Sequence, residues 1–127
     1  MKTKKYFFAV IVLVFSISCN AQVYQKIQSG LLFDMDSFTK RILFYDNDIV
    51  RVSVTQKGNP FIDNSLAVNA QPKDVEFSVS EKGEKIVLST KNLILEIDKQ
   101  TGAIQYFNNQ ERHYLSEHPT ITPVLKD

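Results

Sequence analysis

The acidic side chains that could carry out acid–base chemistry are scattered through this sequence and do not form a known motif. Glu111 and Glu117 are candidates for the two carboxyl groups that glycoside hydrolysis would need. Such a pair requires a defined separation across a cleft, and any chain with 14 acidic residues contains many pairs at this spacing. No serine lies in G-x-S-x-G, and no glycine-rich phosphate loop is present. The sequence therefore predicts no catalytic residue and no cofactor-binding residue.

Two acidic triplets and two histidines are the candidate metal ligands. The triplets are "DMD" (34–36) and "DND" (46–48), and neither has the glycine and glutamate that a calcium-binding EF-hand loop places at fixed later positions. "DND" is more simply a turn, because Asp and Asn hydrogen-bond to their own backbone. His113 and His118 are five residues apart, and no partner lies at a zinc-ligand spacing. We expect no metal site and two surface histidines.

Arg51 is unusual because it lies within the apolar run of "DIVRVSVT" (48–55). Alternation along a strand places Val50, Val52 and Val54 on the core face, so Arg51 points to the wetter face. Acidic residues on neighbouring strands are its expected partners, in an ion pair worth about 0–1 kcal/mol if exposed. A structural role is therefore favoured over a catalytic one.

Exposed aromatic rings would suit a sugar-binding surface. Tyr106, Phe107 and Tyr114 are the candidates, and the alternative is that these rings fill the core. The sequence favours the core, and the absence of tryptophan further weakens the case for a sugar-binding face.

The elements that must position these residues are short strands. Apolar and polar residues that alternate along the chain are typical of strands with one buried face. This alternation predicts segments at 23–28, 30–35, 40–46, 48–55, 74–80, 85–90, 92–98, 103–108 and 112–117, with the first two forming one strand or two. Gly30 is expected at a bulge or bend, Gly83 within the link 81–84, and Gly102 at the end of the turn 99–103. No helical stripe is present, so we predict an all-β, antiparallel β-sandwich.

The single long connection covers residues 56–72. Loops of this length are uncommon unless they are functional. A crossover between two sheets, or a short edge strand at "SLAV" (65–68), is the simpler interpretation and the favoured one.

The N-terminal residues have the layout of a secretory signal peptide. A basic start is followed by an apolar run from Tyr6 to Phe15 and then by small and polar residues. The run is shorter than the roughly 20 apolar residues that span a membrane. We therefore expect residues 1–21 to be removed, and the remaining domain, 22–127, to be exported to the periplasm or the cell exterior with no transmembrane span.

Two routes of processing remain open at this site. Cleavage after Ala21 would leave Gln22 as the first residue, and this route is favoured. Alternatively, Cys19 is the lipidated cysteine of a bacterial lipoprotein, although Ser16 stands where leucine is usual. Cys19 is the only cysteine, so residues 22–127 contain no internal disulfide.

Charge and length limit the remaining possibilities. The whole chain of 127 residues carries a formal charge of +1, whereas residues 22–127, with 12 basic and 14 acidic side chains, carry −2. This length corresponds to one domain. A weakly acidic domain lacks the basic surface that nucleic acid or an anionic membrane would attract, so no nucleic-acid partner is expected.

The order of segments resembles the N-terminal domain of bacterial family-31 glycoside hydrolases, which include α-glucosidases and α-xylosidases. The resemblance is carried by "ILFYDNDIVRVSVTQKG", by "SLAVNAQP", by "VEFSVS" and by "LILEIDKQTGAIQYFNNQERHYLSE". It covers roughly residues 24 to 118, and the combination of segments is more specific than any one of them.

The resemblance implies a galactose-mutarotase-like sandwich that packs against a (β/α)₈ barrel. In that family the barrel holds both catalytic aspartates of a retaining mechanism and acts on α-linked glycans. This chain has no counterpart of those aspartate motifs, so no site residue is carried over. The expected role is a non-catalytic domain that supports the barrel and shapes the mouth of its pocket.

Two further interpretations follow from the same residues. The chain ends at "TITPVLKD", which suggests a fragment of a longer enzyme whose sandwich lacks its last strands and exposes an edge or an apolar face. The alternative function is a stand-alone secreted carbohydrate-binding module.

Overall fold

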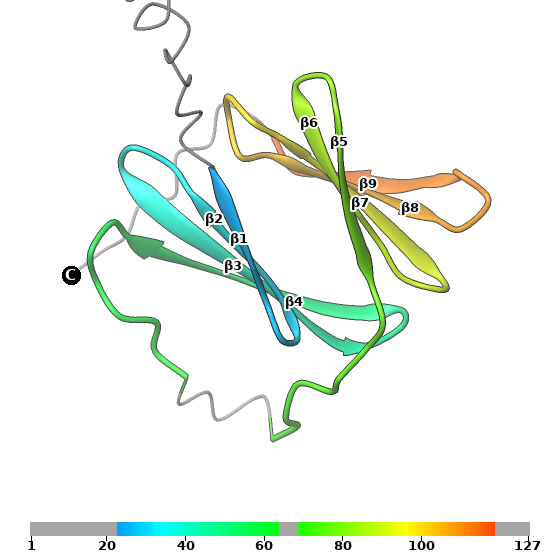
Figure 1. Ribbon diagram of the computed structural model, residues 1–127, viewed down its shortest axis with the longest axis horizontal. Helices are drawn as coiled ribbons and strands as arrows, with labels where there is room; N and C mark the ends of the chain where they lie inside the picture. The colour runs from blue at the N-terminus through cyan, green and yellow to red at the C-terminus, as the bar shows by residue number, and fades with distance from the viewer. Residues whose placement is uncertain (1–22, 64–68, 119–127) are drawn as a thin grey trace, which may run out of the picture.

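The computed structural model describes residues 23–63 and 69–118, which form two antiparallel sheets (Figure 1). Several predictions lie outside these ranges: the signal peptide at 1–21 with Cys19, the "SLAV" segment (65–68) and the final residues "TITPVLKD" (120–127). No helix is present in the described residues.

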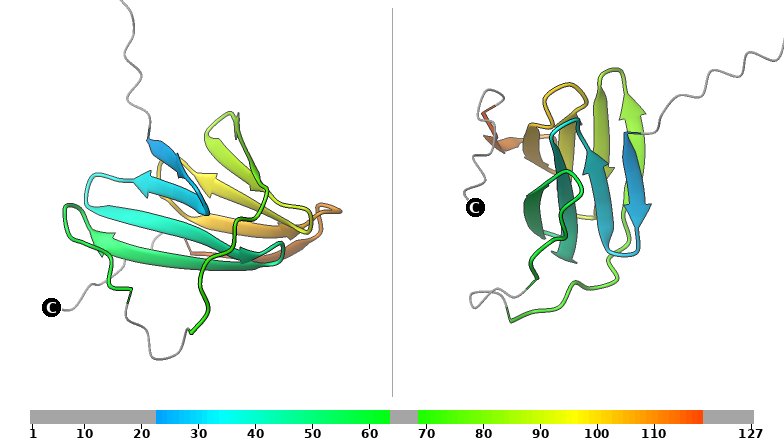
Figure 2. Two further views of the ribbon diagram at one scale, coloured as in Figure 1. Left: turned by 60° about the horizontal axis from the view of Figure 1, so that its bottom comes forward. Right: turned by 90° about the vertical axis from the view of Figure 1, so that its left-hand side faces the viewer.

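Each sheet is a simple meander in which sequence neighbours pair. The first sheet contains β1 (Tyr24–Ile27), β2 (Gly30–Asp34), β3 (Phe38–Asp46) and β4 (Ile49–Gln56) in that order. The second sheet contains β5 (Ser78–Lys82), β6 (Lys85–Ser89), β7 (Leu93–Asp98), β8 (Ile104–Asn108) and β9 (His113–Ser116). The two views of Figure 2 show these sheets as the layers of a sandwich, which confirms the predicted fold class.

The core lies between the sheets and comes from the predicted alternation. The first sheet contributes Leu31, Phe33, Ile42 and Phe44, and the second contributes Ile86, Leu88, Leu93, Leu95, Ile97 and Ile104. In β4, Val50 and Val52 pack against this core, whereas Ile49 at the start of the strand is 56% exposed. The predicted register of β4 is therefore correct.

Most predicted turns are confirmed. Asn47 and Asp48 connect β3 to β4, and the N–H of Asn47 donates to Oδ1 of Asp46 at 2.9 Å. Gly83 has a φ of +60° at the first position of a two-residue hairpin turn, where glycine avoids the strain that a side chain would cause. The segments at 23–28 and 30–35 are two paired strands.

Gly30 is required for a different reason from the predicted bulge or bend. It is the first residue of β2 and lies opposite Leu43 in β3. A Cβ at this position would be 1.8 Å from the carbonyl oxygen of Ile42. Glycine is therefore needed because the backbone of β3 approaches too closely for any side chain.

The predicted strand at 74–80 is wrong in its bounds. Its last residues, from Ser78 onward, form β5, which continues to Lys82 and reduces the predicted link 81–84 to two residues. Pairing with β6 starts at Ser78 opposite Ser89, and the chain turns at Thr90, so residues 74–77 have no β6 partner. Val75 and Phe77 nevertheless bury their side chains as expected.

The long connection is a crossover from one sheet to the other. It leads from the end of β4 to the start of β5, and its described residues, 57–63 and 69–77, are drawn in green in Figure 1. The ring of Phe77 lies 5.1 Å from that of Phe44, and Lys26 Nζ lies 4.5 Å from the Phe77 ring. The end of the crossover therefore packs against β1 and β3 of the first sheet.

Candidate functional site

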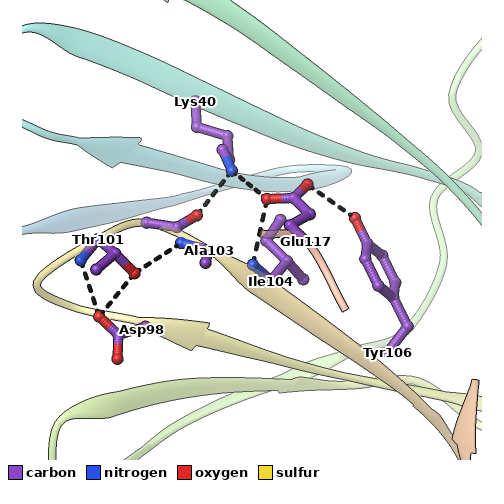
Figure 3. Close-up of polar contacts among 8 residues, drawn as sticks. Lys40, Asp98, Thr101, Ala103, Ile104, Tyr106 and Glu117 are labelled. Atoms are coloured by element: carbon purple, nitrogen blue, oxygen red, sulfur yellow. Dashed lines mark hydrogen bonds and ion pairs between the residues drawn. The ribbon is translucent and has the colours of Figure 1, made fainter. Parts of the chain in front are cut away.

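A buried lysine connects the two sheets. Lys40 lies on the core-facing side of β3, in line with Ile42 and Phe44, and its side chain is only 7% exposed. Its Nζ donates to the carbonyl oxygen of Gly102 and to Oε2 of Glu117, both at 2.7 Å (Figure 3). The paired carboxylate compensates for burying this charge.

Glu117 is the centre of this network. Its Oε2 also accepts from the backbone N–H of Ile104 at 3.2 Å, and its backbone N–H donates to the carbonyl oxygen of Ile104 at 2.8 Å. The hydroxyl of Tyr106 donates to Oε1 at 3.4 Å (Figure 3). Burial raises the pKa of Tyr106, and the nearby Glu117 charge and this hydrogen bond raise it further. These contacts give Glu117 a structural role.

The structure separates Glu111 from Glu117. Glu111 is exposed in the hairpin turn before β9, with a φ of +61°, and Glu117 follows the other end of β9. Since β9 has four residues at about 3.4 Å each, the two residues lie at opposite ends of a strand roughly 14 Å long. Because Glu117 is also held by Lys40, the geometry gives no support to an acid–base pair.

One acid of each triplet contacts a polar or basic side chain of the same protein. Asp34 accepts from the hydroxyl of Thr39 at 2.6 Å. Asp46 pairs with Lys73 at 2.6 Å, and the hydrogen bond from Lys73 is the main reason that its pKa lies below the usual value. Within 23–63 and 69–118, no group of three or more His, Cys, Asp or Glu residues is arranged to hold a metal ion.

Both histidines are on the surface, as predicted. The Nε2 of His113 lies 2.7 Å from Oγ of Ser116, and its ring meets the edge of Phe107 with centroids 5.4 Å apart. His118 is exposed after the last strand.

Two arginines on the outer face of the first sheet meet the start of the crossover. Arg41 forms an ion pair with Asp63, and its guanidinium lies 4.3 Å from the ring centroid of Phe61. The hydrogen bond from Arg41 is the main cause of the lowered pKa of Asp63, and the charge of Arg51 contributes in the same direction. Among the described residues Arg51 forms no ion pair with an acid on a neighbouring strand, so the predicted pairing is not found; its charge acts on Asp63 in the crossover only as a lesser influence beside Arg41.

An open hollow of about 830 Å³ lies between β4 and the β8–β9 hairpin. Two of the three predicted aromatic candidates, Tyr106 and Tyr114, line it, whereas Phe107 instead contacts His113. Tyr106 also packs against the core, and Tyr114 is 60% exposed. The expectation that these aromatics fill the core is thus correct for Tyr106 and wrong for Tyr114.

Sequence reasoning missed two parts of this arrangement. Lys40 was overlooked, although the alternation that assigns Ile42 and Phe44 to the core assigns Lys40 to the same face. The amides of Asn92, Asn108, Asn109 and Gln110 around the hollow were also overlooked. The run "NNQ" beside Tyr106-Phe107 is the sequence signal that would have indicated them.

The part of the chain that the structure describes contains no helix long and apolar enough to cross a membrane.

Comparison with known proteins agrees with this fold. Residues 39–123 match the family described as glycosyl hydrolase 31 N-terminal galactose mutarotase-like domain. One relative, alpha-glucosidase 2 of Bacillus thermoamyloliquefaciens, is 26% identical over 98 residues. The aligned region is 77% of this chain and 12% of that relative, so the chain spans only a small part of the protein it matches. Because the family match covers more than half of the chain, this chain belongs to the family of glycosyl hydrolase 31 N-terminal galactose mutarotase-like domains.

Proposed function

We propose that this chain is the exported, non-catalytic N-terminal domain of an α-glycosidase. The observation that carries the proposal is the family match over residues 39–123, together with the similarity to a protein named alpha-glucosidase 2. On this proposal a (β/α)₈ barrel elsewhere in the polypeptide hydrolyses α-linked glycans, and the sandwich packs against it and shapes the mouth of its pocket.

The contacts of the acidic residues support a non-catalytic role. Glycoside hydrolysis needs two carboxyl groups across an open cleft. Five carboxylates are instead engaged in ion pairs with neighbouring cations, those of Asp46, Asp63, Glu81, Glu96 and Glu117. For Asp46, Asp63 and Glu81 the hydrogen bond from the paired cation holds the pKa below its usual value, which makes these three groups poorly suited to donate a proton.

Export is supported by the first 21 residues. Their basic start, apolar run and small-residue end are typical of a secretory signal peptide. Mass spectrometry of the mature N-terminus tests this step. A terminal Gln22 would indicate simple cleavage, diacylglycerol on Cys19 would indicate a lipid anchor, and an intact Met1 would contradict export.

The enzymatic part of the proposal is tested in two stages. The coding DNA is first sequenced past the codon for Asp127, where we expect the frame to continue into a barrel with paired aspartates. The purified chain and the longer polypeptide are then assayed on 4-nitrophenyl α-glucoside and α-xyloside. Turnover by the longer polypeptide alone is expected, and turnover by the 127-residue chain would overturn the non-catalytic role.

A further inference from the structure

The hollow between β4 and the β8–β9 hairpin has a lining that suggests a ligand. Ile49, Val50 and Val52 line it from β4, and Tyr106, Tyr114 and Leu115 line it from the hairpin. Ile49 and Leu115 are 56% and 54% exposed, so apolar surface remains open to solvent here.

A β-bulge directs Tyr114 into this hollow. Tyr106 pairs with Leu115 and Phe107 pairs with His113, so Tyr114 is the extra residue between two pairs. Such a bulge changes the direction of a side chain relative to regular alternation. As a result, the consecutive residues Tyr114 and Leu115 both line the hollow, which a regular strand would not allow.

The polar part of the lining is almost uncharged. Among the described residues, four amide side chains line the hollow, and Asp48 is the only charged residue in this lining. Asn108 Oδ1 accepts from the backbone N–H groups of Gln110 at 3.0 Å and Arg112 at 2.7 Å. These bonds engage Oδ1, so Nδ2 is the hydrogen-bond donor that the Asn108 amide can offer to another group.

A second hollow, of about 770 Å³, provides a contrast. It is lined by residues of both charges, including Asp46, Asp74, Glu76, Lys73 and Lys91. Two of these charges, those of Asp46 and Lys73, already pair with each other. Nothing in that lining selects one class of ligand.

We propose that the hollow between β4 and the β8–β9 hairpin is a subsite for a neutral oligosaccharide. A sugar ring has apolar C–H faces and a rim of uncharged hydroxyl groups. The exposed Tyr114 ring and the apolar residues of β4 match the faces, and the amides match the hydroxyls, which act as both donors and acceptors. An ionic ligand is disfavoured because the lining formed by residues 23–63 and 69–118 offers no cation and a single carboxylate.

The experiment titrates the purified, isotope-labelled chain with maltotriose and, separately, with cellotriose, followed by amide NMR shifts. We expect saturable shifts at residues 48–52 and 108–115. Tyr114→Ala should weaken binding about fivefold or more, since the stacking ring is lost. Tyr114→Phe should bind within about twofold of the unchanged chain, because the ring remains.

Ile62→Ala is the matched control. Ile62 is 83% exposed but lies in the crossover and does not line the hollow. It should therefore leave binding unchanged, and an equal loss in Ile62→Ala and Tyr114→Ala would overturn the subsite.

The subsite rests on the proposed function in one respect, the choice of an α-linked sugar as a probe. Other outcomes of the titration distinguish failure of the subsite from failure of the proposed function. Binding of cellotriose alone would support the subsite while removing support for an α-linked substrate. Failure of both sugars to saturate would overturn the subsite and leave the proposed function standing. A dimer in sedimentation that Tyr114→Ala dissociates would also overturn it, because a second copy would then be the occupant.

Discussion

The Nζ of Lys40 lies 2.7 Å from Oε2 of Glu117, and this contact joins the inner face of the first sheet to the segment that follows the last strand of the second. The two residues are 77 positions apart in the sequence. Lys40 also binds the carbonyl oxygen of Gly102. One ammonium group therefore connects β3 to the turn that precedes β8 and to the residue that follows β9.

Removing the lysine should destabilise the sandwich. Lys40→Met keeps the apolar part of the side chain but removes the ammonium group that donates to Glu117 and to the Gly102 carbonyl, and Glu117 retains only the weaker hydrogen bonds from Ile104 and Tyr106. Loss of one partner of a buried pair costs about 3–5 kcal/mol, and the 31% exposure of Glu117 reduces this to about 2–4 kcal/mol. Urea denaturation at pH 7 measures the change.

Lys99→Met is the control for this prediction. Lys99 pairs with Glu81 at the surface, at 2.5 Å, and exposed pairs contribute little to stability. The loss in Lys99→Met should be clearly smaller. Equal losses of stability in the two variants would mean that the buried Lys40–Glu117 pair stabilises the fold no more than an exposed pair does.

Gly30→Ala should be among the most damaging small substitutions. The added Cβ would be 1.8 Å from the Ile42 carbonyl oxygen, so the β2–β3 pairing must shift. We expect a loss of about 3 kcal/mol or more in thermal denaturation. A Cβ added at Gly58 would have no atom within 4 Å, and the φ there is +89°. Gly58→Ala should therefore lose only the roughly 1–2 kcal/mol of stability that a left-handed conformation costs a non-glycine residue. The reverse order of stability would contradict the close approach.

Arg41 should control how tightly the start of the crossover is held. Arg41→Ala removes the cation–π contact with Phe61 and the ion pair with Asp63. A cation–π contact is worth about 0.5–1 kcal/mol, which corresponds to about two- to fivefold faster opening of the segment. Limited chymotrypsin digestion after Phe61 measures this rate.

Arg51→Ala is the control, because the contact between Arg41 and Phe61 is intact in this variant. It should be cut at nearly the original rate. If digestion of Arg51→Ala were accelerated as much as that of Arg41→Ala, the result would argue against the Arg41 contact.

Asp98 should contribute a pH-dependent part of the stability. Burial raises its pKa, but hydrogen bonds from the N–H and hydroxyl of Thr101 and the N–H of Gln100 outweigh this effect, and the pKa lies below 3.8. A carboxyl group with a lowered folded pKa stabilises the fold above its unfolded pKa, and this contribution is lost as the pH falls through the folded pKa.

Asp98→Asn removes this titration while preserving the acceptor Oδ1. The urea midpoint of the unchanged chain should therefore fall more between pH 6 and pH 3 than that of Asp98→Asn. Identical pH profiles in the two proteins would show that the turn hydrogen bonds do not depend on the carboxylate charge.

Much of the fold could be predicted from alternation alone. Buried residues such as Ile86, Leu88, Leu95 and Ile97 recur every second position, and this period specifies both the strand and its core face. Turns at Asn47, Gly83 and Gly102 were predictable because their geometry depends on local backbone preferences. The bounds of β5 were not, because pairing there ends where β6 ends at Ser89, which is information about the partner strand.

The sequence by itself determined that this chain forms strands, which residues enter the core and where the chain turns, because these depend on side-chain period and local conformation. The tertiary structure decided what the polar and aromatic residues do. It paired Lys40 with Glu117, separated Glu111 from Glu117, and brought Tyr114 and Tyr106 to one hollow opposite β4. These relationships join residues that are distant along the chain or depend on a bulge between two strands, and no local pattern specifies either.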